Sequence, residues 1–413
     1  MTIWLERLFL LLIFSLGFMQ PSISVSGLAI VPTELIFLIV AGLFAVSLLV
    51  RSSSLELSLA YLWLAAYFVA MVLSGVFSLQ PHTSLIKLAG VAYLLGLAVL
   101  TINLVKTEVA VKSVALTWIA ASTIVSLIGV VTVAMFYIDR QSWWNDIFLH
   151  HYGSLPAGNY PRIQSTFIYP AMLCNYFTVG ILLTLAAIKN RWIGKKWSVA
   201  ILVVHGIAAS FTITPGLGGL IAGVALWLAI YWRESGRRQT GIIAVIVGSI
   251  LGLAFLIVSA FSIFPITTSP YTIDLWGVRL DPTQRLLTWQ GSIETFLAYP
   301  IFGKGVGLGT ANVIFQAPSG QMQRLTDAHQ TFLSIAGQAG ILGVAVLAGL
   351  IVYVVRIGLP LGFGDDKIKT VRTSLLIALI SGLIIQGFVG SFEDARHLWI
   401  VIGLLVAISS IKD

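Results

Sequence analysis

Long apolar runs separated by short polar segments dominate the chain. A helix needs about 20 apolar residues to cross a bilayer, and we count about twelve runs of that kind. The pattern therefore predicts an all-α polytopic integral membrane protein, with residues 1–413 forming a single transmembrane domain. The predicted spans are residues 7–26, 30–50, 57–79, 84–105, 113–137, 166–188, 197–214, 217–232, 241–263, 330–355, 371–390 and 397–411.

Two of the predicted outer loops are long, residues 139–165 and residues 264–328, the second lying between spans nine and ten. Long loops in compact proteins are usually functional. In the second loop we expect short amphipathic helices, the clearest beginning at Asp281-Pro282 with Asp as N-cap and Pro in the first turn. Its apolar residues recur at helical spacing until Tyr299-Pro300, so we expect it to lie along the outer membrane surface.

Composition and charge agree with this pattern. Hydrophobic residues make up 58% of the chain and charged residues 10%, whereas a soluble domain carries about 25% charge. The net charge of +8 fits the positive-inside rule better than nucleic-acid binding. With a cytoplasmic N-terminus, 16 of the 24 Lys and Arg residues fall in cytoplasmic segments. We therefore predict two cytoplasmic termini, and a first span that is retained because no small-residue cleavage site follows it.

Metal-ligating patterns are scarce. The single cysteine, Cys174, lies in an apolar run, there is no Asp-x-Asp, and the adjacent His150 and His151 would point apart on a helix. We therefore expect no metal and no cofactor.

The strongest local candidate for chemistry is His329, in Thr326-Asp327-Ala328-His329-Gln330 at the entry to the tenth span. If Thr326 or Asp327 caps that helix, His329 lies in its first turn. The helix dipole would favour a neutral imidazole, which a general base needs, whereas Asp327 would favour imidazolium. The alternative is a polar residue that merely marks the membrane interface.

Arginines on the predicted outer side form the second candidate group, because guanidinium binds phosphate oxygens bidentately. Several together could neutralise a diphosphate without a metal. The alternative is pairing with lipid headgroups or with nearby carboxylates such as Asp281, Asp327, Glu393 or Asp394; for the polar cluster 391–397 a structural ion pair is the favoured interpretation. The arginines are Arg162, Arg279, Arg285, Arg324 and Arg396, of which Arg285 is the leading candidate.

Two further features have competing interpretations. The run Gly303-Lys304-Gly305-Val306-Gly307-Leu308-Gly309 follows no strand of a βαβ unit, so we expect a close backbone approach, or a turn that braces Arg285, rather than a dinucleotide loop. His205 lies inside the seventh span, where an ionisable residue suggests function, but a hydrogen bond between helices is at least as good an explanation.

Together these residues resemble the O-antigen ligase and polymerase superfamily. The resemblance rests on Arg285 followed by Trp289, on Tyr-Pro-Ile-Phe-Gly-Lys-Gly-Val-Gly over 299–307, on Asp-Ala-His-Gln-Thr-Phe-Leu over 327–333, and on Gly-Gln-Ala-Gly-Ile-Leu-Gly over 337–343. The topology match covers most of the chain and the motif match about 60 residues.

The resemblance implies a bacterial inner-membrane glycosyltransferase, similar to the GT-C enzymes and independent of metal. Such an enzyme moves a glycan from undecaprenyl diphosphate to an acceptor sugar hydroxyl on the periplasmic face, the acceptor being another lipid-linked repeat or lipid A-core. By the same resemblance His329 is the base or the group that orients the acceptor, Arg285 and Arg162 bind the diphosphate, and Asp327, Gly303, Gly305 and Glu393 support the site. We expect one inverting step, and polysaccharide assembly proteins are possible partners.

The sequence departs from the family pattern in one place. Many members have Ser-Arg-Gly or Thr-Arg-Gly at the outer end of the seventh span, where this chain has Thr212-Ile-Thr214-Pro215-Gly216. One phosphate contact is then absent, or is supplied by Arg279, Arg324 or Arg396. The alternative function is a polysaccharide transporter or flippase, which would need ionisable groups near the membrane midplane, where this chain has few.

Overall fold

Apolar helices lie at all twelve segments predicted to span the membrane. The computed structural model describes residues 2–20, 22–25, 28–50, 55–56, 58–150, 161–262, 273–275, 278–316, 322–364, 366–390 and 395–411. The helices at the predicted spans are α1 (Thr2–Ser15), α2 (Pro32–Leu49), α3 (Ala60–Val76), α4 (Pro81–Leu104), α5 (Glu108–Ile138), α7 (Pro170–Lys189), α8 (Lys195–Ser210), α9 (Leu217–Glu234), α10 (Arg238–Ala260), α12 (Thr331–Gly358), α13 (Lys367–Val389) and α14 (Arg396–Ser410).

Two more helices lie in the described part of the predicted outer loops: α6 (Trp143–Phe148) and α11 (Gln284–Ala298). Among the described residues, seven helices are long and apolar enough to cross a membrane: α2, α4, α5, α7, the Arg238–Phe255 part of α10, α12 and α13. The predicted fold class, an all-α polytopic membrane protein, is therefore confirmed.

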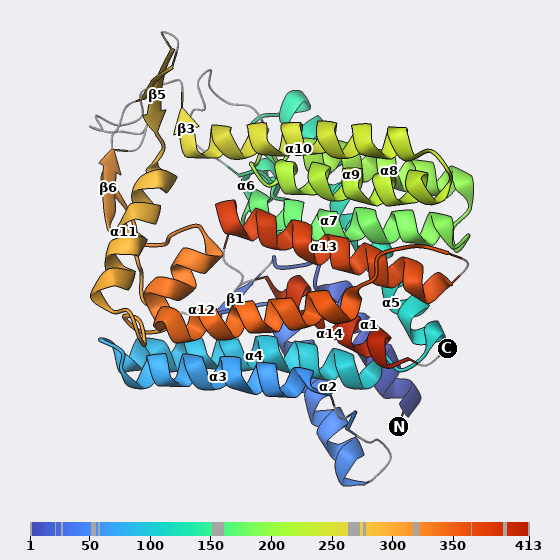
Figure 1. The fold of residues 1–413 in the computed structure, drawn as a ribbon, viewed down its shortest axis with the longest axis horizontal. Helices are drawn as coiled ribbons and strands as arrows, with labels where there is room; N and C mark the ends of the chain where they lie inside the picture. The colour runs from blue at the N-terminus through green and yellow to red at the C-terminus, as the bar shows by residue number, and fades with distance from the viewer. Residues whose placement is uncertain are drawn as a thin grey trace.

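Most of the helices run roughly parallel, while α11 and α2 lie across them (Figure 1). α8, α9 and α10 form one side of the bundle and α3 and α4 the opposite side, with α7, α12, α13 and α14 between them. α7 is the most enclosed candidate span, with 78% of its most apolar window buried against 17% for α10. α11 and the strands near it lie at one end of the bundle, and both chain termini lie towards the other.

The first predicted span, residues 7–26, is wrong at its C-terminal end. α1 stops at Ser15, and Gly17 follows where the backbone passes close to the Tyr176 hydroxyl. The chain then forms an antiparallel hairpin of β1 (Ile23–Val25) and β2 (Leu28–Ile30). Pro21 cannot donate a helical hydrogen bond, and the β-branched residues after it favour strands.

The long loop before α12 contains short strands that the periodicity did not predict. β3 (Phe261–Ser262), β5 (Val278–Pro282) and β4 (Ile273–Leu275) form a small antiparallel sheet, and β6 (Val313–Gln316) pairs with β7 (Met322–Leu325). Asp281 and Pro282 pair with β3, so they do not start the predicted helix. α11 begins after Thr283 instead, and it ends at Tyr299 as expected.

α12 is interrupted in its N-terminal half. Gly340 has φ +63° and ψ −162°, which no helical residue adopts, so α12 consists of two helices joined at this residue. The first helix begins at Thr331 and the second continues to Gly358. The interruption gives the loop 299–305 access to peptide groups of α12 that a regular helix would have paired internally.

Candidate functional site

His329 lies just outside α12, two residues before its first helical residue. The N-cap is Gln330, whose side chain accepts a hydrogen bond from the Leu333 backbone N–H. The expectation that Thr326 or Asp327 caps the helix, with His329 in its first turn, is therefore wrong. His329 has φ +49°, a left-handed conformation that is uncommon for residues other than glycine. Gln330 caps α12 because its side chain folds back onto the first turn of the helix.

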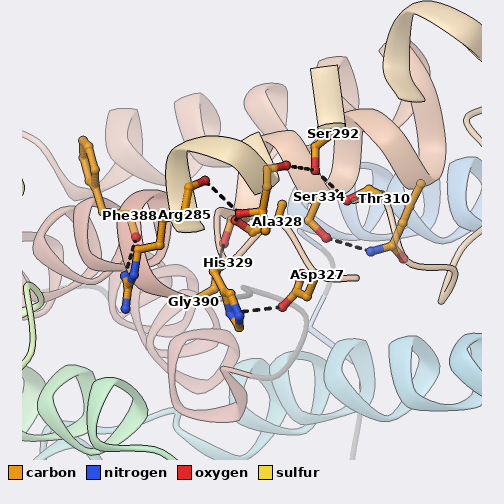
Figure 2. Close-up of polar contacts among 12 residues, drawn as sticks. Arg285, Ser292, Thr310, Asp327, Ala328, His329, Ser334, Phe388 and Gly390 are labelled. Atoms are coloured by element: carbon orange, nitrogen blue, oxygen red, sulfur yellow. Dashed lines mark hydrogen bonds and ion pairs between the residues drawn. The ribbon is translucent and has the colours of Figure 1, made fainter. Parts of the chain in front are cut away.

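The His329 imidazole lies between charges of opposite sign. Its Nδ1 is 3.5 Å from Asp327 Oδ2, and its side chain is 39% exposed (Figure 2). Burial lowers the pKa of His329 below its ordinary value, the Asp327 carboxylate opposes this shift, and the Arg285 guanidinium adds to it. The net direction is down, so the imidazole is neutral near neutral pH.

Arg285 is the second residue of α11, and it joins that helix to the end of α13. Its Nη1 donates a 2.9 Å hydrogen bond to the Phe388 carbonyl (Figure 2). The side chain is half-buried, and its positive charge contributes to the lowered pKa of His329. The described structure thus brings together three of the predicted site residues, Arg285, Asp327 and His329.

Hydroxyl groups on one face of α11 hold the helix against this site. Thr288 Oγ1 donates to the Arg285 carbonyl at 2.8 Å, and it lies 3.3 Å from the Ala328 carbonyl, next to His329. One turn further on, Ser292 Oγ lies 2.9 Å from Thr310 Oγ1 (Figure 2). A buried hydroxyl hydrogen bond of this kind contributes about 1 kcal/mol, and the contact of Thr288 with Ala328 holds α11 beside the His329 segment.

The glycine segment packs against the interruption in α12. The backbone N–H groups of Lys304 and Gly305 donate to the carbonyls of Gly337 and Gln338, at 2.8 Å and 3.0 Å. Gly303 has φ +74°, and a Cβ there would lie 2.1 Å from the Gln338 carbonyl. The close backbone approach predicted for Gly303 and Gly305 is therefore what the described residues show. Gln338 completes the junction, because its Oε1 accepts a hydrogen bond from the Gly307 N–H.

An apolar groove of about 420 Å³ runs between α12 and α13 and ends beside the site. Trp289 and Gln330 line the end of the groove nearest His329, and Trp289 contacts the ring of Phe388 at 6.0 Å between centroids. The remaining lining residues are all apolar: Phe332, Ile351, Val355, Ile380, Leu383, Ile384, Gly387 and Phe388.

Arg162 contacts the segment that follows the C-terminal end of α8. Its Nε donates to the Thr212 carbonyl at 3.0 Å, and its own carbonyl accepts a hydrogen bond from the His150 N–H. This is the segment in which many family members carry an arginine that is absent here. A guanidinium therefore reaches that region from a different part of the chain.

Arg396 is paired with a carboxylate that the sequence analysis did not consider. Its Nη2 is 2.5 Å from Glu34 Oε1, and the guanidinium lies 5.7 Å from the centre of the Tyr93 ring. The other Glu34 oxygen accepts a hydrogen bond from the Val31 N–H at the start of α2. The pair ties α14 to α2, which agrees with the structural interpretation of this end of the 391–397 cluster.

The remaining candidates are not placed at the site by any described contact. Arg324 is exposed on β7, and its Nε donates to Asn312 Oδ1 at 2.8 Å. Arg279 lies in β5, opposite Asp274, but its side chain is outside the described part of the structure. Glu393 also lies outside the described residues.

His205 and Cys174 lie within the bundle. The His205 ring joins helices, with Nε2 2.9 Å from Ser122 Oγ of α5 and Nδ1 2.8 Å from the Ile201 carbonyl. This is the hydrogen bond between helices that the sequence analysis offered as an alternative to function. Cys174 is a buried free thiol. Among the described residues, no three His, Cys, Asp or Glu side chains come together as a metal site.

Sequence reasoning missed the partners that position the arginines. The Phe388 carbonyl and Glu34 are remote from Arg285 and Arg396 along the chain, and no local pattern links them. Gln338 carried a signal, because it lies in the Gly-Gln-Ala-Gly motif, but the motif does not say which backbone groups it contacts.

A comparison with known families supplies the remaining evidence. Residues 198–348 match the family model described as O-antigen ligase, Wzy_C. The matched segment extends from α8 into α12, and it includes Arg285, the glycine segment and His329. No curated protein matches the chain significantly. This match supports the resemblance of the chain to the O-antigen ligase and polymerase superfamily.

Proposed function

We propose that this protein moves a glycan from undecaprenyl diphosphate to an acceptor sugar hydroxyl at the outer face of the bacterial inner membrane. The observation that carries the proposal is the pairing of Arg285 with a neutral His329 at one end of the bundle. A fixed cation beside a neutral base suits transfer from a diphosphate leaving group. The family match supports a ligase-type membrane glycosyltransferase.

The apolar groove between α12 and α13 is where the donor's isoprenoid tail would lie. Phe388 lines the groove, and its carbonyl accepts the hydrogen bond from Arg285. The Arg285 guanidinium therefore lies beside one end of the apolar groove. A lipid diphosphate has the matching chemistry, an anionic head on a long hydrocarbon chain.

In the proposed reaction, the acceptor hydroxyl oxygen attacks the anomeric carbon of the donor glycan. The bond from that carbon to the phosphate oxygen breaks, and undecaprenyl diphosphate leaves with the bonding electrons. The hydroxyl proton passes to His329. Because Nδ1 faces Asp327, Nε2 is the nitrogen that accepts the proton. Direct displacement of this kind inverts the anomeric carbon and needs no covalent enzyme intermediate.

Arg285 would stabilise the charge that develops on the leaving diphosphate. One fixed donor to a developing oxyanion is often worth about 3–4 kcal/mol. Arg162 is the second candidate for this role, since its Nε donates to the Thr212 carbonyl, in the segment that lacks the arginine of the family pattern. Charge neutralisation by guanidinium groups is also the reason we expect the reaction to be independent of metal.

The proposal is tested by measuring glycan transfer from a purified lipid-linked donor in the presence of EDTA. We expect His329→Ala and Arg285→Ala each to lower kcat by about 100-fold or more, while Arg237→Ala, an exposed cation at the opposite end of the bundle, stays active. Full activity of both site variants would contradict the site assignment. Activity lost in EDTA alone would contradict metal independence.

The same purified protein and donor distinguish a glycosyltransferase from a transporter, and a polymerase from a ligase. A transporter would move a lipid-linked glycan across a vesicle membrane without forming a new glycosidic bond, so its product would equal its substrate. A polymerase lengthens a lipid-linked repeat, whereas a ligase needs lipid A-core, and offering each acceptor separately decides between them.

A further inference from the structure

A polar pocket of about 470 Å³ opens beside the C-terminal half of α11, on a different face from the apolar groove. One wall is formed by α11 and Tyr299, which ends it, and the other by the segment after the glycine run. The lining residues are Gly291, Glu294, Thr295, Ala298, Tyr299, Lys304, Thr310, Ala311 and Asn312.

The pocket offers hydrogen-bonding groups of both kinds around an aromatic ring. Glu294 is exposed, and one carboxylate oxygen accepts a 3.1 Å hydrogen bond from Gln290, which leaves the second oxygen to accept another. Asn312 accepts a hydrogen bond from Arg324 through Oδ1, so its amide N–H groups are left to donate to a ligand. The Tyr299 ring is 39% exposed.

The charges of the pocket balance, which argues against an anionic ligand. The Lys304 ammonium is held by the Gly309 carbonyl at 3.0 Å and is opposed by the Glu294 carboxylate in the same pocket. A neutral polyhydroxyl compound fits better, because carboxylate, amide and phenol groups match hydroxyl donors and acceptors. Its C–H faces would pack on the aromatic ring of Tyr299.

The pocket is connected to the Arg285–His329 site through α11. Thr295 Oγ1 donates to the Thr310 carbonyl at 2.7 Å. Thr310 Oγ1 lies 2.9 Å from the Oγ of Ser292, on the same side of α11 as Thr288 (Figure 2). From Arg285 to Thr295 is ten residues, or about 15 Å along a helix. An oligosaccharide that begins at a diphosphate on Arg285 can extend over this distance, while a single sugar cannot.

We propose that this pocket binds sugar residues of the substrate glycan, away from the bond that reacts. The inference rests on the proposed glycosyl transfer, and it adds an extended saccharide site with Tyr299, Glu294 and Asn312 as its binding residues. The pocket selects oligosaccharide substrates over single sugars, and it takes no part in the bond-breaking step.

The primary test is direct binding to the full-length protein in nanodiscs. The probe is a free neutral oligosaccharide released from a lipid-linked donor, measured by calorimetry. We expect Tyr299→Ala and Glu294→Gln each to weaken binding about tenfold or more, with no change in Tyr137→Ala, an exposed tyrosine on α5. Arg285→Ala should bind the probe normally, because the probe carries no diphosphate. Failure of the wild-type protein to bind, or equal binding by both pocket variants, overturns the inference.

Kinetics identify which glycan occupies the pocket. With undecaprenyl diphosphate carrying an oligosaccharide, a higher KM for the donor in Tyr299→Ala identifies the donor glycan, and a higher KM for the acceptor identifies the acceptor glycan. With undecaprenyl diphosphate carrying a single N-acetylglucosamine, the pocket variants should match the wild type. Loss of transfer from both donors in Arg285→Ala, but not in Tyr299→Ala, separates the catalytic proposal from this one.

Discussion

The imidazole of His329 is held between Asp327, which stabilises its protonated form, and Arg285, which opposes it. The positive φ of His329 is what places its side chain there, because a regular helical start would have aligned it with α12. The backbone conformation of His329 therefore determines which charges act on the protonation of its imidazole.

The pH dependence of kcat/KM should report this arrangement. A base must be neutral, so activity falls as pH drops through its pKa; since the pKa of His329 is lowered, the fall should lie below about pH 6.5. Asp327→Asn removes the group that raises the pKa, and should move the acid limb to lower pH. Arg285→Gln removes a group that lowers it, and should move the limb of its residual activity to higher pH. Shifts in the opposite directions would show that another group titrates.

At Gly303, both the backbone conformation and the close packing against α12 exclude a side chain. Gly303→Ala adds a methyl group 2.1 Å from the Gln338 carbonyl at φ +74°, so we expect loss of folded protein in thermal unfolding. Gly236→Ala is the control, because its φ is +77° but nothing lies within 4 Å of the added carbon. It should lose only about 1–2 kcal/mol from the left-handed conformation. Equal stability of the two variants would mean that the junction between the glycine segment and α12 can move apart.

At the scale of elements, α11 has three faces with different roles. One face bears Arg285, Thr288 and Ser292 and contacts the His329 segment. A second lines the polar pocket, and a third exposes the apolar side chains of Ile293 and Leu297. This division agrees with the amphipathic helix predicted from the sequence. It explains how one short helix could contact the Arg285–His329 site, the polar pocket and the membrane lipid.

The groove between α12 and α13 provides a prediction at this scale. Ile384→Trp fills part of the groove, and should raise KM for the lipid-linked donor with little change in kcat. Each buried methylene contributes about 0.8 kcal/mol, so displacing two of them weakens tail binding about tenfold. Ile246→Trp is the matched control on the exposed surface of α10. An unchanged KM for Ile384→Trp in a donor titration would show that the tail lies elsewhere.

At the scale of the whole molecule, the site-bearing end and the chain termini are separated along the bundle (Figure 1). Small residues allow the helices to approach closely, as where a Cβ on Gly218 of α9 would lie 2.8 Å from the Gly252 carbonyl of α10. Close contacts between small residues are typical of helix packing in membranes.

Orientation is tested by cysteine labelling in a Cys174→Ala background. Gln290→Cys on α11 should react with an impermeant maleimide added outside intact cells. Ser235→Cys, after α9, should react only once the membrane is opened. The reverse pattern would contradict the cytoplasmic placement of the termini, and with it the outer location of the proposed reaction.

The sequence alone determined the features that depend on neighbouring residues. Apolar run length located the helices, apolar periodicity located most of α11, and the Asp-Ala-His-Gln and glycine motifs indicated the family. These are local signals, since a helix needs apolar length to meet lipid wherever it packs. The C-terminal end of the first span and the strands of the long loop were misjudged, because Pro21 and the pairing of β5 with β3 override the local pattern.

Only the tertiary structure decided which groups meet. The hydrogen bond from Arg285 to the Phe388 carbonyl, the Arg396–Glu34 pair and the packing of Gly303 on Gln338 each join residues far apart along the chain. Two pockets on different faces of α11 likewise exist only because other segments form their second walls. Residue type determines what chemistry is available, but distances between remote residues depend on how the helices pack, and no local pattern encodes them.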